Sequence, residues 1–253
     1  MQARDVHSLL HDGTPHLVTV LPTVDSTNAY LRRLAAEGAP DGTAVIAEAQ
    51  TAGRGRLGRQ FASPPGAGLY MSVLLRRDIP VSRLPLLTPY VAVAAARAVE
   101  RLAPVRVGIK WVNDLRIGEH KIAGILTEGG LADRERLAYA VVGVGINLLP
   151  KALPAELSGI AAAIGDFAPP PSTAAMAAAL LDALFADYAA FEDGSFLGEY
   201  RRRSVVLGRT VTATDGERSI SGVAEAIEND GALRLMTEDG PICLRAGEVS
   251  IRM

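Results

Sequence analysis

The chain has 253 residues, of which 49% are hydrophobic and 21% are charged, and its formal net charge is −2. This composition indicates a globular protein with one large domain, or one large and one small domain, and it excludes a disordered chain. The near-neutral charge disfavours a nucleic-acid-binding protein, and no uncharged apolar run approaches the ~18 residues of a membrane span. A single cysteine, Cys243, excludes an internal disulfide and a cysteine-rich zinc site. Because no signal-peptide pattern is present either, we expect a protein of the cytoplasm.

Strand and helix patterns alternate in the first third of the chain. Residues 25–38 carry an apolar stripe at helical spacing and end at Gly38, which favours a helix stop. Residues 51–68 contain several Gly and Pro residues and show no periodicity, which is typical of a long loop. The expected elements in chain order are a strand at 17–24, a helix at 25–38, a strand at 43–49, the loop at 51–68 and a buried strand at 69–75.

The middle of the chain predicts two long helices with strands between them. Residues 86–103 are rich in alanine and have a helical pattern, with Pro89 expected in the first turn. Ser172 or Thr173 is the expected cap of the second helix. The elements are the helix at 86–103, strands at 105–111 and 122–128 on either side of a turn near Gly118, a strand at 137–149 and a helix at 174–192.

The pattern changes near residue 204, where short β-type runs begin to alternate with glycines. This spacing is the signature of a small barrel, and about 50 residues is near the lower limit for a domain that folds alone. We therefore expect two domains, at 1–203 and 204–253, with the second leaning on the first. Cys243 lies in one of the short runs and is expected to be a packed apolar residue.

Residue types that the chain rarely uses cluster in a few short segments. Of the 26 basic residues only three are lysines, at 110, 121 and 151, and Trp111 is the single tryptophan. Asparagine occurs four times, at 28, 113, 147 and 229. Because the chain uses arginine and alanine almost everywhere else, the segments that contain these rare types are candidates for function.

Residues 53–59 read Gly-Arg-Gly-Arg-Leu-Gly-Arg and lie in the predicted long loop. Glycine lets a backbone approach a ligand closely, and the planar arginine fork suits phosphate and carboxylate oxygens. Such a loop could become ordered over an anionic ligand. The alternative is a solvated Arg/Gly loop of the kind that binds RNA. The segment is not a Walker A loop, because no Gly-Lys-Ser/Thr follows it.

Two segments with lysine follow the loop. Lys-Trp-Val-Asn-Asp at 110–114 offers an asparagine with both the donor and the acceptor that reading an adenine-like edge needs, and Asp114 could orient an amine. The alternative is an ordinary Asn-Asp turn beside a core tryptophan. Lys-Ile-Ala-Gly-Ile-Leu at 121–126 could place an ammonium beside a reacting carboxylate or phosphate. The alternative there is an edge lysine that reaches out to water.

Two further segments offer polar contacts. Gly-Val-Gly-Ile-Asn at 143–147 puts two glycines into a buried strand, where close approach of a ligand would justify their cost in stability. Its Asn147 could bind a nucleotide or cap the end of the strand. Asp-Ser-Thr-Asn at 25–28 and Gln50 could recognise the carbonyl or urea group of a small ligand, although Ser, Thr and Asn are also the standard helix caps. The four histidines have no metal-binding spacing, so no metal ligands are predicted.

Taken together and in this order, the segments resemble the biotin–protein ligases, also called biotin–[acetyl-CoA-carboxylase] ligases. The matching segments are Ser-Thr-Asn at 26–28, GRGRLGR at 53–59, KWVND at 110–114, KIAGIL at 121–126 and GVGIN at 143–147. The resemblance implies an α+β fold, in which a mixed β-sheet flanked by helices (the class II synthetase-like biotin ligase core) is followed by a small SH3-like β-barrel. The chain departs from the usual pattern at Phe61, where many members have Trp, and at Val112, where many have Pro.

The resemblance also implies an ATP-dependent ligase. Such enzymes activate the carboxylate of biotin with ATP and Mg²⁺ to biotinyl-5′-AMP. They then pass biotin to one lysine of the biotin carboxyl carrier protein domain of a biotin-dependent carboxylase. Because activation brings two anions together, cationic side chains and Mg²⁺ are the expected electrostatic catalysts. The resemblance allows a homodimer through sheet edges, and we expect neither a nucleic-acid nor a membrane partner.

Residue roles follow from the same resemblance, position by position. The expected catalytic residues are Arg54, Arg56, Lys121 and Asp114, of which the last would orient the incoming lysine. The expected biotin-binding residues are Ser26, Thr27, Asn28, Gln50, Gly53, Arg54, Gly55, Arg56, Lys121, Gly124, Leu126 and Gly143. The expected ATP-binding residues are Arg56, Arg59, Phe61, Asn113, Lys121 and Asn147.

Other functions are open at this point. A lipoate–protein ligase shares the core fold but would lack the segments at 53–59 and 110–114 as they stand here. A non-enzymatic RNA-binding module would use the Arg/Gly loop and the barrel, although the loop has no interleaved aromatic residues for base stacking. Some biotin–protein ligases also repress transcription through an N-terminal DNA-binding domain. Only 25 residues precede Ser26, so we expect the monofunctional type.

Overall fold

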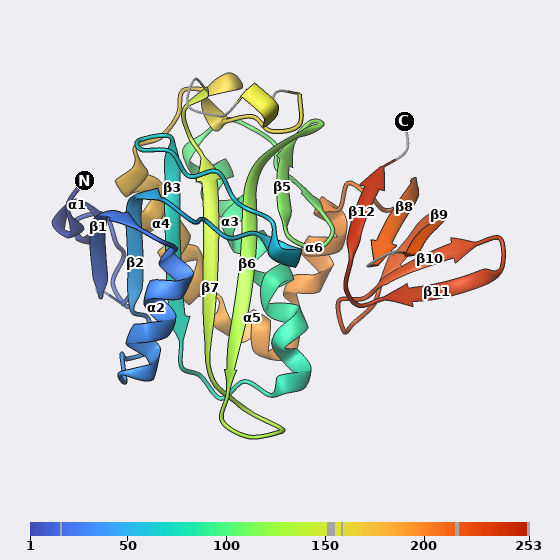
Figure 1. The fold of residues 1–253 in the computed structure, drawn as a ribbon, viewed down its shortest axis with the longest axis horizontal. Helices are drawn as coiled ribbons and strands as arrows, with labels where there is room; N and C mark the ends of the chain where they lie inside the picture. Colours follow the sequence, from blue (N-terminus) through green and yellow to red (C-terminus); the bar gives the residue numbers. More distant parts are fainter. Residues whose placement is uncertain (16, 151–154, 158, 216–217, 252–253) are drawn as a thin grey trace.

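A computed structural model of the chain describes residues 1–15, 17–150, 155–157, 159–215 and 218–251. Its centre is a seven-stranded mixed sheet with the strand order β1-β2-β3-β7-β6-β5-β4 (Figure 1). The first two strands in this order pair in parallel and their neighbours pair antiparallel. The strands are β1 Val18–Val24, β2 Ala44–Gln50, β3 Gly68–Leu75, β4 Gly108–Lys110, β5 Asp114–Ile117, β6 His120–Leu131 and β7 Leu137–Asn147.

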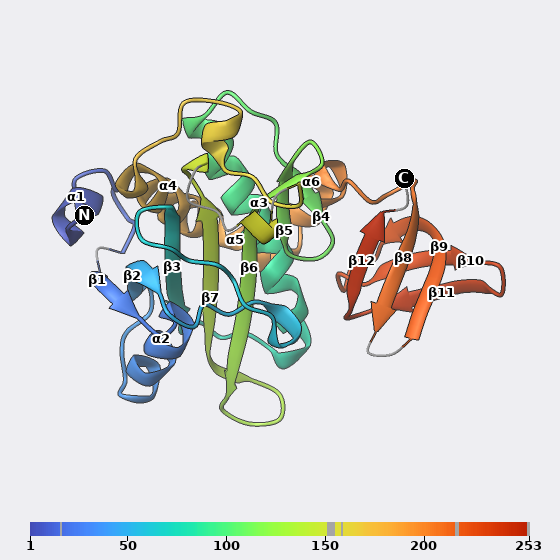
Figure 2. The ribbon, with the colours of Figure 1, turned by 45° about the horizontal axis from the view of Figure 1, so that its top comes forward.

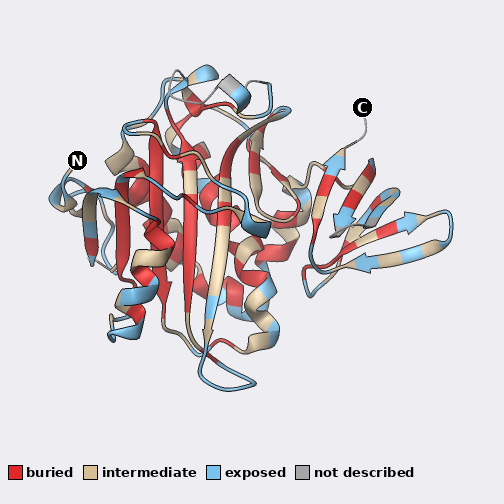
Figure 3. Cartoon of the chain, in the orientation of Figure 1, coloured by how far each residue is buried: buried red, intermediate tan, exposed pale blue. Residues whose placement is uncertain are grey.

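Helices cover both faces of this sheet. On one face α2 (Thr27–Ala36) packs over β2, β3 and β7, with Leu31 against the strands. The larger core lies on the opposite face, against α3 (Leu84–Leu102) and α4 (Thr173–Ala186). Because both faces are covered, β3 is buried along its whole length (Figure 3). The shorter helices are α1 Ala3–His7, α5 Tyr188–Asp193 and α6 Phe196–Arg203.

Most predicted elements of the sheet domain are confirmed within a few residues at each end. These are the strands at 17–24, 43–49, 69–75 and 137–149, and the helices at 25–38 and 86–103. The cap of α4 is Ser172, whose hydroxyl accepts a hydrogen bond from the Ala175 N–H at 3.2 Å. None of the helices in the described part of the chain is long and apolar enough to cross a membrane.

Other predicted elements differ from the structure. The region predicted to hold two strands, at 105–111 and 122–128, holds a third strand, β5, between them. β5 leaves no periodic pattern in the sequence, because it has only four residues and its register with β6 shifts after Leu115. The helix predicted at 174–192 is interrupted at Asp187, which separates α4 from α5. Pro89 lies inside α3 and not in its first turn, because the helix begins earlier, at Leu84, and Pro85 occupies that turn. The short helices α1 and α6 were not predicted.

The C-terminal residues form a five-stranded antiparallel sheet with the order β11-β10-β9-β8-β12. Figures 1 and 2 show it beside the β4–β5 side of the central sheet, far from β1. The predicted β-unit is confirmed, but in the described residues its edge strands do not pair with each other, so the sheet stays open and is not a closed barrel. Cys243 is exposed, which contradicts the prediction that it is packed. The strands are β8 Thr210–Asp215, β9 Arg218–Ile227, β10 Leu233–Thr237, β11 Gly240–Leu244 and β12 Glu248–Ile251.

Trp111 connects the two sheets. Its ring is buried in the core, as in the alternative interpretation of its segment, and its indole Nε1–H donates to the backbone carbonyl of Gly231 at 2.9 Å. Replacing Trp111 by phenylalanine keeps an aromatic ring but leaves the Gly231 carbonyl without this donor. We expect the free energy of unfolding to fall by about 1–3 kcal/mol, measured by urea denaturation. An unchanged unfolding midpoint would contradict a stabilising role for this hydrogen bond.

Candidate functional site

A cavity of about 480 Å³ opens on the α2 face of the central sheet. The loop between β2 and β3 crosses in front of β7 and β6 and covers it (Figure 1). The walls come from the start of α2, the loop, the β4–β5 turn, β6, β7 and β12. Segments that are more than 200 residues apart in the chain therefore meet around one space.

Of the predicted site residues, all of which the structure describes, Gly53 alone does not line the cavity. It is buried in the loop, where a Cβ atom would lie 2.3 Å from the backbone oxygen of Phe61 and 3.1 Å from Gln50 Nε2. Glycine at position 53 therefore lets the loop pack closely against Phe61 and Gln50, because any side chain would clash there. The residues that do line the cavity are Ser26, Thr27, Asn28, Gln50, Arg54, Gly55, Arg56, Arg59, Phe61, Asn113, Asp114, Lys121, Gly124, Leu126, Gly143 and Asn147.

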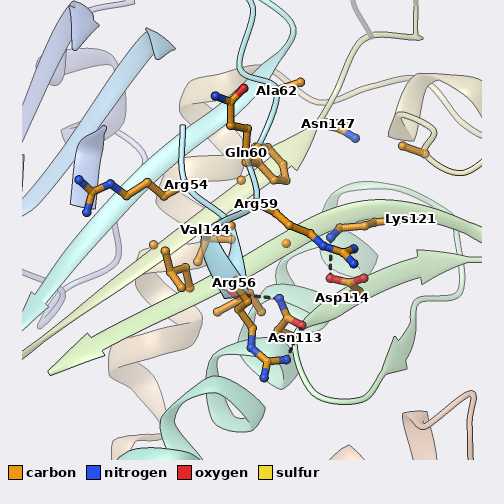
Figure 4. A pocket seen from close by; sticks show the side chains of 18 of the residues that line it. Arg54, Arg56, Arg59, Gln60, Ala62, Asn113, Asp114, Lys121, Val144 and Asn147 are labelled. Carbon is orange, nitrogen blue, oxygen red and sulfur yellow. Dashed lines mark hydrogen bonds and ion pairs between the residues drawn. The ribbon is translucent and has the colours of Figure 1, made fainter. Parts of the chain in front are cut away.

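Charged side chains from β4, β5 and β6 meet in one wall of the cavity. The Lys121 Nζ lies 2.6 Å from the Asp114 Oδ1 (Figure 4), and strand pairing sets Lys110 directly opposite Asp114. Burial lowers the pKa of the Lys110 ammonium, and Asp114 opposes this effect. Two ammonium groups and one carboxylate thus face the same space, which suits an anionic ligand.

The Arg/Gly loop contributes its arginines in three different ways. Arg56 donates to Asn113 Oδ1 at 3.3 Å, and burial lowers the pKa of its guanidinium. Arg59 forms an ion pair with Glu248 at the start of β12, which ties the loop to the C-terminal sheet. The side chain of Arg54 is exposed and points away from Lys121 and Asp114 (Figure 4), so it is not brought to the other cations.

The amides of two asparagines are held by backbone carbonyls at the cavity wall. Asn113 Nδ2 donates to the Ile125 carbonyl at 3.0 Å, and the Ile125 N–H donates back to the Asn113 carbonyl at 3.1 Å. Asn147 is almost fully buried and its Nδ2 donates to the Ala162 carbonyl at 3.1 Å. The nitrogen end of each amide is thus held by a backbone carbonyl, and the Asn113 oxygen also accepts from Arg56.

The helix start at 25–28 is both a cap and a cavity wall, so the two interpretations of this segment are compatible. Ser26 is the N-cap of α2, and its hydroxyl accepts from the Ala29 N–H at 3.5 Å. Thr27 donates from its backbone N–H to Gln50 Oε1 at 2.8 Å. Polar side chains therefore line one end of the cavity.

Glycines on β6 and β7 make room for two neighbouring side chains. A Cβ atom on Gly143 would lie 2.1 Å from Asn28 Oδ1, so this glycine admits the Asn28 amide. Gly124 and Gly145 pair across the strands, and the Phe61 ring lies 2.4 Å from the place of a Cβ on Gly145. The backbone of Gly124 and Gly145, covered by the Phe61 ring, thus forms part of the cavity wall.

Several lining residues were not predicted as site residues. Lys110 carried a signal in the sequence, because it is one of three lysines, but no role followed from its segment. Glu248, Val249 and Ser250 come from β12, and no local pattern connects them to the residues at 26–147. Their place in the wall results from how the C-terminal sheet packs.

The described residues contain no cluster of three or more His, Cys, Asp or Glu that could hold a metal ion. The cavity wall does offer two carboxylates, Asp114 and Glu248. Mg²⁺ is usually bound by one or two carboxylates together with substrate phosphates. Both carboxylates are ion-paired here, Asp114 with Lys121 and Glu248 with Arg59, so they would help to hold Mg²⁺ only together with substrate phosphates.

Two family patterns match the chain. Residues 20–147 match the Biotin/lipoate A/B protein ligase family, and residues 206–252 match the Biotin protein ligase C terminal domain. The first match contains all five segments on which the sequence resemblance depends. The second coincides with the C-terminal sheet.

Individual relatives are similar over most of the chain. The biotin–[acetyl-CoA-carboxylase] ligase of Mycobacterium tuberculosis is 33% identical over 239 residues, which cover 91% of this chain and 87% of that protein. The bifunctional ligase/repressor BirA of Escherichia coli is 32% identical over all of this chain and 78% of its own. The BirA protein of Bacillus subtilis is 42% identical over 147 residues, and there the match spans only 45% of the relative's length.

The fold has been seen in solved structures. The biotin protein ligase from Aquifex aeolicus in complex with biotin and ATP has a TM-score of 0.77 to this chain and is 29% identical to it. The superposition covers 93% of this chain and 98% of that one. The resemblance thus extends over both sheets.

Proposed function

Because the chain belongs to the biotin/lipoate A/B protein ligase family and carries a biotin protein ligase C-terminal domain, we propose that it joins biotin to a protein with ATP. The observation that carries the proposal is that Lys121, Asp114 and Arg56 line the same cavity as the polar side chains of Ser26 and Thr27. A structural relative with 29% identity binds biotin and ATP, which supports the same ligands here.

In the first step, a carboxylate oxygen of biotin attacks the α-phosphorus of ATP. The bond from that phosphorus to the bridging oxygen of the β-phosphate breaks, so that biotinyl-5′-AMP forms and pyrophosphate leaves. The two reacting groups are both anions, and Lys121 and Arg56 reduce their repulsion. Such preorganised donors are worth roughly 3–4 kcal/mol each in an excluded site.

Mg²⁺, when bound, neutralises charge on the phosphates and orients them. Asp114 and Glu248 are the carboxylates of this cavity that would help to hold it. Three further side chains contact the nucleotide in the first step. Asn113 and Asn147 offer amide oxygens to the nucleotide, and the ring of Phe61 offers a stacking face.

In the second step, the amine of a carrier lysine attacks the acyl carbon of the adenylate, the bond from that carbon to the phosphate oxygen breaks, an amide forms, AMP leaves and the amine gives up one proton to solvent. The amine must be neutral to attack. Asp114, at the β4–β5 turn, would orient it by accepting a hydrogen bond. The carrier would be the biotin carboxyl carrier domain of a biotin-dependent carboxylase, and a position in the cytoplasm stays a prediction.

The experiment that tests this function is biotin-dependent exchange of labelled pyrophosphate into ATP, followed by transfer to a carrier domain. Lipoate offered in place of biotin separates the two ligase types, and we expect exchange with biotin alone. Exchange with lipoate and none with biotin would contradict the proposal.

The proposed domain boundary, between 203 and 204, is tested by limited proteolysis.

A further inference from the structure

We infer that Glu128, Asn28 and Ser72 form a hydrogen-bonded relay that holds Thr27 as a hydrogen-bond acceptor at the polar end of the cavity. The relay would select a ligand that presents an N–H group to Thr27. The inference rests on the proposed function for the ligand, since the cyclic urea of biotin carries two N–H groups. In this account Glu128 and Ser72 are positioning residues, which act through their neighbours.

The relay begins at the carboxylate of Glu128 on β6, whose side chain is 24% exposed. Its Oε1 accepts from Arg32 Nη1 at 3.0 Å, and its Oε2 accepts from Asn28 Nδ2 at 2.8 Å. An ionised carboxylate can only accept hydrogen bonds. The nitrogen end of the Asn28 amide must therefore face Glu128, and its second N–H lies 3.2 Å from the Leu126 carbonyl.

With its nitrogen turned to β6, Asn28 presents its oxygen to Ser72. The Asn28 Oδ1 lies 2.6 Å from Ser72 Oγ, and a carbonyl oxygen can only accept. The hydroxyl hydrogen of Ser72 is therefore committed to Asn28. Ser72 is fully buried in the middle of β3, among apolar residues, which is unusual for a polar side chain without a structural task.

Gln50 has a defined orientation as well. Its Oε1 accepts from the Thr27 backbone N–H at 2.8 Å, so its Nε2 faces Ser63 and donates to Oγ there at 2.8 Å. The Ser63 hydroxyl in turn donates to the Phe61 carbonyl at 3.0 Å. The oxygen of Gln50 that faces Thr27 is thus an acceptor.

Thr27 Oγ1 stands between two groups that only accept. Ser72 Oγ lies 2.8 Å away with its hydrogen already used, and Gln50 Oε1 lies 3.1 Å away. The single hydroxyl hydrogen of Thr27 goes to one of them. Because Thr27 lines the cavity and its hydrogen is already used, a ligand that reaches this hydroxyl meets an acceptor and not a donor.

This arrangement has a consequence for ligand choice. A site built to pair with an N–H rejects an analogue that has an oxygen there, because two acceptors then face each other. Glycine at 143 belongs to the same device, since a side chain would displace the Asn28 amide. Through Asn28 and Ser72, the Glu128 carboxylate, which does not itself line the cavity, thus fixes which hydrogen-bonding group Thr27 presents to a ligand.

The test compares Glu128→Leu, which has no acceptor, with Glu128→Gln, which keeps a carbonyl acceptor. The matched control is Glu199→Leu, which removes an ion-paired acid on α6 whose side chain is 18% exposed and lies outside the cavity. The readouts are KM for biotin, KM for ATP and kcat in pyrophosphate exchange. A second readout is the preference for biotin over a cyclic carbamate analogue, in which one ureido N–H is replaced by oxygen.

We expect Glu128→Leu to raise KM for biotin about tenfold, the cost of an unpaired polar group, while KM for ATP and kcat change less than about twofold. The preference for biotin over the carbamate should fall at least fivefold, on the order of one lost hydrogen bond. Glu128→Gln should restore both values to within about threefold of wild type. Should leucine prevent folding, Glu128→Met gives the same test, because methionine also lacks a strong acceptor and adapts to irregular packing.

The relay is overturned if the carbamate preference is unchanged in Glu128→Leu, if both KM values rise together, or if Glu199→Leu has the same effects. These results differ from a failure of the proposed function. A wild-type protein without biotin-dependent exchange contradicts the proposed function and the relay together, whereas an active wild type with an unaffected variant contradicts the relay alone.

Discussion

Replacing Lys121 by alanine is expected to lower biotin-dependent pyrophosphate exchange by at least about a hundredfold, the loss typical of one preorganised charged donor. In the structure the Lys121 ammonium lies 2.6 Å from Asp114 in the cavity wall. Its removal takes a positive charge away from the two reacting anions. It also leaves the Asp114 carboxylate facing them without its partner, so that repulsion increases further.

Two variants make the measurement on Lys121 specific. Arg234→Ala removes another ion-paired cation, on the C-terminal sheet and outside the cavity lining, and should leave the exchange rate near that of the wild type. Lys121→Arg keeps the charge but places it in a planar fork, and should recover part of the loss. Exchange by Lys121→Ala at a rate close to the wild type would refute the assignment of Lys121.

Replacing Arg56 by glycine has the second large expected effect, which is release of the adenylate before transfer. Arg56 anchors the Arg/Gly loop by donating to Asn113 Oδ1 at 3.3 Å. A glycine removes this hydrogen bond and the guanidinium that makes it, so the loop closes over the mixed anhydride less of the time. Escaped adenylate reacts with any accessible amine, and we expect labelling of a bystander protein to rise about tenfold, the factor that one hydrogen bond to a charged group supplies.

A flexibility control lies in the same loop. Leu57 has a φ of 54°, a backbone conformation that favours glycine, and its side chain is 65% exposed. Leu57→Gly therefore changes the loop without removing a guanidinium, and bystander labelling should stay near the wild-type level. If Arg56→Gly leaves the bystander unlabelled while transfer to the carrier is normal, the loop does not retain the adenylate.

The ion pair of Arg59 with Glu248 places the C-terminal sheet in contact with the same loop. Trp111 and Arg201 hold that sheet against the central domain, the latter by donating to the Ile227 carbonyl at 2.8 Å. The C-terminal sheet thus forms part of the cavity wall. A sheet of this size is small for independent folding, so its contacts with the central domain also stabilise it.

Local sequence patterns were sufficient to predict the helices and strands in which buried residues recur at the spacing of the element. The apolar runs of β3 and β7 and the stripe of α2 are each covered by helices, so their periodicity reports their surroundings directly. β5 and α6 were missed for the opposite reason. The first has four residues and an irregular register, and the second carries Gly198 and three consecutive arginines that mask its three buried residues, Phe196, Leu197 and Tyr200.

The five ordered segments, by themselves, indicated the family and supplied more than half of the residues that line the cavity, because the spacing of motifs along strands and turns is a local property. Only the tertiary structure decided which groups face one another. The ion pair of Lys121 with Asp114, the exposed direction of Arg54, the packing role of Gly53 and the presence of Glu248 all depend on strand register and on the docking of a second sheet. Contacts between residues far apart in the chain leave no trace in local composition, since burial and pairing are set by the whole fold.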